Sequence, residues 1–104
     1  MKVRILGHDY EVEYKDHVDH DGNEEGMTYH WECRIEIKSA LMTKSKQEEC
    51  LLHEIIEAIN RMLELKLEHN QITSLAAGLY QVIADNPGPG LDFGRGETDT
   101  ERGS

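Results

Sequence analysis

The period of the hydrophobic pattern changes once along this chain of 104 residues, and that change constrains the fold more than any other feature. In the first forty residues apolar and polar side chains alternate, which is typical of strands with one buried face. From Ser45 onward apolar side chains recur at spacings of three and four, which is typical of helices. The pattern predicts an α+β domain, in which a small antiparallel β-sheet of three or four strands packs on two α-helices.

The strand region contains two alternating parts. Residues 2–6 and 10–14 flank a Gly7-His8-Asp9 turn and predict an opening hairpin, in which Val3, Ile5, Val12 and Tyr14 are available for one face. Residues 29–38 predict a further strand, with one apolar face made by Trp31, Cys33, Ile35 and Ile37. Residues 16–26 are acidic and have almost no apolar content, so we expect a solvated loop or long turn there.

The helical region divides into two amphipathic segments. The first begins at Ser45, which has a glutamate three residues later as in a capping box, and it ends near Leu67. The second runs from about Asn70 and stops before Asn86-Pro87, because proline disfavours helical backbone in the residue before it. We therefore expect two long helices that face each other across a short connection.

The C-terminal end has a different composition. Beyond Pro87 the sequence is rich in glycine and polar residues and buries too little surface to offset the entropy of ordering. We predict a single zincin-like domain over residues 1–87 and a flexible Gly/Pro-rich polar tail over residues 88–104, the zincin-like character resting on the family resemblance described below.

The charge of the chain limits its partners. The formal net charge is −10, and none of the 11 basic residues form a run, so we expect no nucleic-acid partner. No apolar stretch approaches the roughly 18 to 20 residues that a membrane span needs, and the N-terminus does not read as a signal peptide. We expect a soluble protein of the cytoplasm, which would be the host cytoplasm if a phage encodes it.

Residues 51–59 read L-L-H-E-I-I-E-A-I and contain the pattern H-E-x-x-E. On a helix, His53 and Glu57 lie four residues apart on one face, where they can converge on one ion, while Glu54 points to its side. Imidazole and carboxylate are both zinc ligands, and His69 offers a second imidazole for a His₂Glu set, with Glu68 and Glu64 as rivals for the third position.

The residues alone leave two interpretations of this motif open. Apolar neighbours surround the three polar groups, which favours a cleft, and buried charges must be paired or bind metal. Without an ion, His53 and Glu57 would form a hydrogen-bonded pair along the helix. Cys50 lies three residues before His53 on nearly the same face; we predict a small buried residue there, with zinc ligation as the alternative.

The order of the elements and two segments, residues 51–59 and L-A-A-G-L-Y-Q-V-I-A-D-N-P at residues 75–87, resemble small phage and prophage zinc-peptidase-like proteins. These stand near the minimal gluzincins of the ImmA/IrrE type, and the similarity covers roughly residues 30–87. The resemblance implies a zincin-like minimal domain with His53 as the first zinc ligand and Glu54 as the base. Glu57 takes the position of the family's second motif histidine, and we infer that His69 restores the ligand count.

We therefore expect a phage-type, zinc-dependent metallopeptidase-like protein that hydrolyses peptide bonds of a peptide or protein through a metal-activated water. Its zinc ligands would be His53, Glu57 and His69, with Glu54 as general base. Two alternatives are a catalytically inactive, metal-stabilised module that binds a host or phage protein, and a metal-free domain. By residue type, the candidates for an oxyanion donor are Tyr80, for which a core position is the favoured interpretation, and the histidines His8, His17, His20 and His30.

Overall fold

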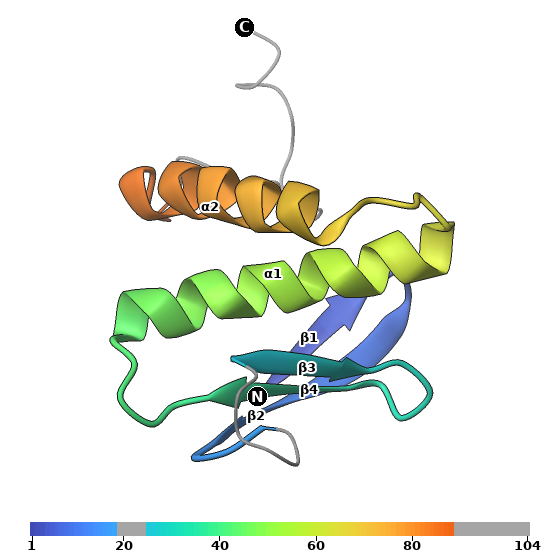
Figure 1. Ribbon diagram of the computed structural model, residues 1–104, viewed down its shortest axis with the longest axis horizontal. Coiled ribbons are helices and arrows are strands. Elements are labelled where there is room, and N and C mark those ends of the chain that lie inside the picture. The colour runs from blue at the N-terminus through green and yellow to red at the C-terminus, as the bar shows by residue number, and fades with distance from the viewer. Residues whose placement is uncertain (19–24, 89–104) are drawn as a thin grey trace, which may run out of the picture.

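The computed structural model describes residues 1–18 and 25–88, which form three layers: a sheet, the helix α1 and the helix α2 (Figure 1). The strands are β1 (Lys2–Ile5), β2 (His8–Lys15), β3 (Gly26–Tyr29) and β4 (Arg34–Lys38), and the helices are α1 (Lys44–Leu63) and α2 (His69–Asp85). This arrangement confirms the predicted α+β class. The middle layer is α1, which contacts β1, β3 and β4 on one side and α2 on the other.

The opening hairpin is confirmed, with a tighter turn than the sequence suggested. β1 and β2 pair antiparallel, with Ile5 opposite His8. The two residues between the strands, Leu6 and Gly7, have φ angles of 48° and 86°. Two-residue hairpin loops favour such positive φ values because they match the twist of the strands, and glycine adopts them without strain.

The sheet is mixed, so the expectation of a purely antiparallel sheet was wrong. Its strand order is β1-β2-β4-β3, and β4 runs parallel to β2 but antiparallel to β3. The reason is that the chain leaves β2 for the far edge of the sheet, forms β3 there and then returns as β4 between the two. A hydrophobic pattern reports which face of a strand is buried, but not which neighbour the strand takes.

The single strand predicted over residues 29–38 was also wrong. Tyr29 ends β3, residues 30–33 form a turn, and β4 begins at Arg34. Trp31 therefore lies on the turn and is 90% exposed instead of buried. Cys33, at the end of the turn, has a φ of 51°, which marks the reversal of the chain.

The main core lies between the sheet and α1. Its buried sheet residues are Ile5, Tyr10, Val12, Ile35 and Ile37, and its buried α1 residues are Cys50 and Ala58. The sequence had assigned four of these, Ile5, Val12, Ile35 and Ile37, to the apolar faces of strands. The same prediction for Tyr14 was wrong, because Tyr14 is 45% exposed. Ala58 is fully buried, and its small side chain lets α1 approach the sheet closely.

Glu36 is a buried carboxylate within this sheet. Its Oε2 lies 2.8 Å from Lys15 Nζ and 3.0 Å from Arg34 Nε. Burial opposes ionisation of the Glu36 carboxyl, but the hydrogen bonds and charges of Lys15 and Arg34 outweigh it, so its pKa lies below the ordinary value. The ion pair of Lys15 with Glu36 joins β2 to β4, whereas that of Arg34 lies within β4.

The helix boundaries differ from the predicted ones at both ends of α1. Thr43, not Ser45, is the N-cap, and its side chain accepts a hydrogen bond from the backbone N–H of Lys46. The helix ends at Leu63, four residues early, because Glu64 takes a left-handed conformation with φ 52°. α2 begins and ends within one residue of the prediction.

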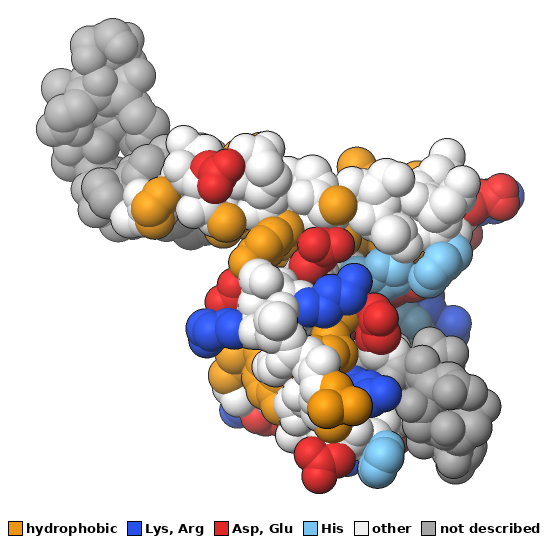
Figure 2. Space-filling model, turned by 60° about the vertical axis from the view of Figure 1, so that its left-hand side comes forward, with side chains coloured by type: hydrophobic (Ala, Val, Ile, Leu, Met, Phe, Trp, Pro, Cys, Tyr) orange, Lys and Arg blue, Asp and Glu red, His pale blue; other side chains and the backbone are white. Residues whose placement is uncertain are grey.

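α2 is the most exposed element of the domain. Only Ile72 and Ala76 of its predicted apolar stripe are buried, against Ile56 of α1 and the neighbouring Leu52 and Leu67. The remaining aliphatic side chains, Leu75, Leu79, Val82 and Ile83, are 40–48% exposed. Figure 2 shows hydrophobic side chains on this upper layer. The reason is that α2 packs on α1 by one face only.

No helix in the described part of the chain is long and apolar enough to cross a membrane. Residues 19–24 of the predicted acidic loop and residues 89–104 of the predicted tail lie outside the described residues.

Candidate metal centre

His53 and Glu57 lie one turn apart on the same face of α1, as their spacing predicts. His53 Nε2 is 3.3 Å from Glu57 Oε2, and both side chains are partly buried, with 16% and 33% of their surfaces exposed. Solvent can therefore reach both side chains, but neighbouring residues limit the orientations that they can adopt.

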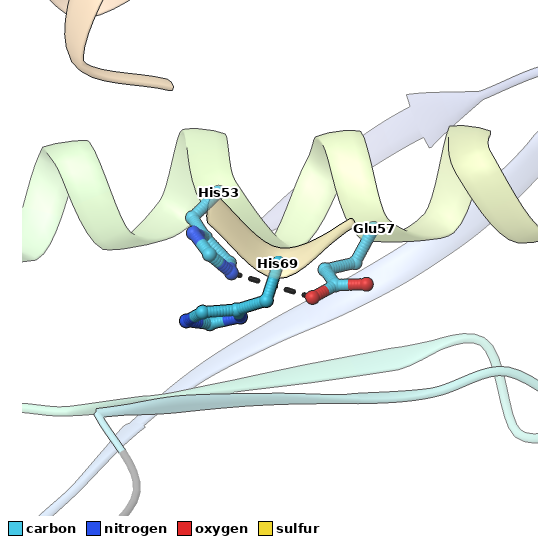
Figure 3. A group of neighbouring side chains, drawn as sticks. All are labelled: His53, Glu57 and His69. Carbon is cyan, nitrogen blue, oxygen red and sulfur yellow. Dashed lines mark ion pairs between the residues drawn. The ribbon is translucent and has the colours of Figure 1, made fainter. Parts of the chain in front are cut away.

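His69, the first residue of α2, completes the group. Its ring centroid is 5.0 Å from that of His53, with 57° between the ring planes. One ligand atom from each of His53, Glu57 and His69 lies within 4.8 Å of the other two, and this is the only such group of three among the described residues. Figure 3 shows the three side chains pointing toward one another, and Figure 2 shows histidines gathered beneath α2.

The connection between the helices places His69. Asn60 of α1 accepts a hydrogen bond from the backbone N–H of Leu67 at 2.9 Å and donates one to the Leu67 carbonyl at 3.4 Å. Glu64 and Lys66 take positive φ angles, which turn the chain back over α1. Ile72, one turn after His69, is buried against α1 and fixes the start of α2 there.

The geometry fits a metal ion bound by two imidazoles and one carboxylate. Two ligands about 2.0–2.1 Å from a tetrahedral zinc ion are separated by about 3.3 Å, and His53 and Glu57 already have this separation. The third ligand atom lies within 4.8 Å, so a change of about 1.5 Å or less brings it to the same separation. His69 is exposed, so rotation about its side-chain bonds can move its ring toward the other two ligands.

Glu54 does not belong to the group of converging ligand atoms, and its side chain contacts β3. Its Oε1 accepts a hydrogen bond from the hydroxyl of Thr28 at 2.7 Å, and its carbonyl oxygen lies 3.2 Å from the same hydroxyl. Gly26 leaves room for the carboxylate, since a Cβ at that position would lie 3.0 Å from both Cγ and Oε2 of Glu54. The Glu54 side chain is therefore held in one place, and only 7% of the residue is exposed.

A cavity of about 380 Å³ connects Glu54 with the metal group. Its lining residues come from around the start of β3, from α1 and from the first five residues of α2: Glu25, Gly26, Lys46, Cys50, His53, Glu54, His69 and Thr73. The cavity therefore brings Glu54 and the two histidines around one space.

Cys50 is buried, as predicted, and does not belong to the group of converging ligand atoms. Its thiol donates a hydrogen bond to Glu25 Oε1 at 3.5 Å. Burial raises the pKa of the Cys50 thiol to about 11, with a further contribution from the negative charge of Glu25. The protein's second cysteine, Cys33, is also a free thiol.

The structure separates the other candidates from this site. Glu64 caps α1 and Glu68 precedes α2, but neither belongs to the converging group, whose third member is His69. The hydroxyl of Tyr80 donates to Glu48 Oε1 at 2.8 Å and does not line the cavity, and the residue is only half-buried.

Sequence reasoning missed Thr28 and Gly26, which position Glu54. Both lie on β3, and no local pattern relates them to residues 26 or more positions later on α1.

Comparison of the chain with models of protein families, with curated proteins and with solved structures found no match.

Proposed function

We propose that this protein is a zinc-dependent metallopeptidase-like protein of the phage type, related to the minimal gluzincins. His53, Glu57 and His69 are its zinc ligands and Glu54 is its general base. The observation that carries this proposal is the convergence of the three ligand atoms from two different helices within 4.8 Å. The spacing of His53 and Glu57 is enough to place them on one face of α1. It does not explain why α2 brings His69 to the same point.

The donor set favours zinc over other common divalent ions. Two imidazoles and one carboxylate are typical of catalytic zinc sites, whereas calcium and magnesium prefer oxygen ligands. Three protein ligands leave a coordination position for water, as catalytic zinc sites require and closed structural sites do not. When bound, zinc would polarise a peptide carbonyl and lower the pKa of water toward about 7.

The chain's own residues supply the proton transfers. Glu54 faces the same cavity as His53 and His69, so it can accept a proton from water there and return it to the leaving amine. Thr28 holds the Glu54 carboxylate by a hydrogen bond, which fixes the direction from which that proton is taken.

Metal content gives the first test. Purified wild-type protein should contain about one zinc ion per chain by mass spectrometry, and His53→Ala and His69→Ala should each lose it. The matched control is His8→Ala, since His8 is an exposed histidine on β2 and lies outside the metal group. Wild-type protein that takes up no zinc from solution would contradict the proposal.

Catalysis needs a separate test with Glu54→Gln. This substitution keeps the size of the side chain and removes the proton acceptor, so peptide hydrolysis should fall by about a hundredfold or more while zinc content stays the same. Equal hydrolysis by wild type and Glu54→Gln would remove Glu54 from the proposed mechanism.

One observation favours a second candidate function, in which the protein binds zinc without catalysis and serves as a metal-stabilised protein-binding module. Glu54 is buried and anchors α1 to β3 through Thr28, so its carboxylate has a structural role of its own. Under this alternative, Glu54→Gln lowers the stability of the fold, and neither the wild type nor the variant hydrolyses peptides.

A further inference from the structure

A second cavity, of about 460 Å³, lies at the other end of α1 from its N-terminus. It is formed between the last turn of α1, the turn that joins β3 to β4, and the start of β2. None of its lining residues belongs to the metal group or to the cavity beside it. The argument for a ligand rests on three lining residues: Arg61, His30 and Trp31.

Arg61 lies at the rim of this cavity with no ion pair or hydrogen bond of its side chain to any residue that the structure describes. Of the arginines that the structure describes, Arg4 and Arg34 form ion pairs and Arg61 does not. Ion pairs are also formed by Lys15, Lys44 and Lys46. Arg61 also complements the C-terminal end of the α1 dipole, but that role leaves its five N–H donors unused.

His30 offers a second polar group to the same space. Its Nδ1 is buried and has no hydrogen-bond partner, the only such side-chain nitrogen or oxygen in the described part of the chain. Burial lowers the pKa of His30 and the positive charge of Arg61 lowers it further; together they outweigh the negative charge of Glu57, which acts in the opposite direction. Because Nδ1 is shielded from the cavity, Nε2 is the nitrogen through which the His30 ring can donate a hydrogen bond to a ligand.

Apart from His8, the remaining wall is formed by apolar and aromatic side chains. Trp31 is 90% exposed on the turn, while Tyr10 and Met62 line the interior. An indole that is left in water beside a cavity gains free energy when a ligand covers it. The cavity therefore combines one guanidinium, one imidazole and an aromatic rim.

We propose that this second cavity binds a small organic carboxylate that carries an apolar or aromatic group, with Arg61 and His30 holding the carboxylate and Trp31 covering the apolar part. The planar guanidinium matches a carboxylate through two parallel hydrogen bonds. A single arginine in a protein of net charge −10 suits a monoanion better than a phosphate dianion, which the acidic surface repels. The carboxylate belongs either to a free small molecule or to the C-terminal residue of a peptide.

The test uses the fluorescence of Trp31, which is the only tryptophan of the chain and lines the cavity. Titration with N-acetyl-phenylalanine should change the emission saturably, and N-acetyl-phenylalaninamide should bind at least about tenfold more weakly because it lacks the charge. The tripeptide acetyl-Gly-Gly-Phe separates the two sources: tighter binding than N-acetyl-phenylalanine indicates a peptide C-terminus, and weaker binding indicates a free carboxylate.

Arg61→Gln should weaken binding of the carboxylate about tenfold or more and abolish the preference over the amide. Lys66→Gln is the matched control, because it removes the same charge from an exposed residue outside the cavity. The zinc content of Arg61→Gln should equal that of wild type, so failure of the zinc proposal leaves this test unaffected. Absence of a saturable change, or equal affinity for the carboxylate and the amide, would overturn the inference.

Discussion

Zinc should stabilise this protein by joining its two helices, and His69 should be necessary for that effect. Few fully buried side chains hold α2 to α1, chiefly Ile72 and Ala76 against Ile56. A metal ion held by His53 and Glu57 of α1 and by His69 of α2 adds a bond between the layers. Because the unfolded chain does not present this geometry, zinc binding shifts the equilibrium toward the folded state.

The magnitude follows from linkage. Free zinc at about one hundred times its dissociation constant stabilises the folded state by about 2.7 kcal/mol. In a domain of this size each kcal/mol shifts Tm by about 4–8 °C, so the expected increase is about 10–20 °C. His69→Ala leaves two ligands on one helix, which cannot join the layers, and the increase should fall below about 4 °C.

The assay is thermal unfolding followed by circular dichroism, with and without zinc. Because His69 is exposed at the start of α2, His69→Ala should change the metal-free stability by only about 0.5 kcal/mol or less. His8→Ala, the control, should retain the full zinc effect. A wild-type Tm that zinc leaves unchanged, or a full zinc effect in His69→Ala, would refute the reasoning.

Three further predictions concern the fold around the site. Gly26→Ala should destabilise the protein by about 1–2 kcal/mol in urea unfolding, because the new Cβ meets the Glu54 side chain at 3.0 Å; a gain in stability would show that the carboxylate moves freely. Thr43→Ala should cost about 1 kcal/mol by the same measurement, whereas Ser45→Ala should cost less than half as much, since only Thr43 caps α1. Because the folded-state pKa of Glu36 lies below its unfolded value of about 4.3, its stabilisation is present above about pH 4.3 and is lost as the pH falls through the folded pKa. Glu36→Gln should therefore weaken the acid dependence of Tm, and an unchanged pH profile would show that this carboxylate does not contribute to it.

The predicted ends of helices and strands were wrong where no distinctive sequence marks a turn. Residues 29–38 alternate throughout, and nothing in that pattern marks the reversal at residues 30–33. Ser45 and Thr43 are both suitable N-caps, and the choice depends on which hydroxyl reaches a free backbone N–H. α2 has an apolar stripe in sequence, but only the part that reaches α1 is buried.

By itself, the sequence determined what depends on local geometry. The change of period gives strands followed by two helices, and the four-residue spacing of His53 and Glu57 places them on one face of α1. These features depend on the pitch of a helix and the pleat of a strand, which are the same in every protein.

The tertiary structure alone decided how distant parts meet. The sequence raised His69 as one of three rival third ligands, and the connection anchored by Asn60 brought it to the group. The path of the chain made β4 parallel to β2 and set β3 beside α1, where Thr28 holds Glu54. Such contacts between residues far apart in sequence depend on how whole elements pack, and no periodicity along the chain encodes them.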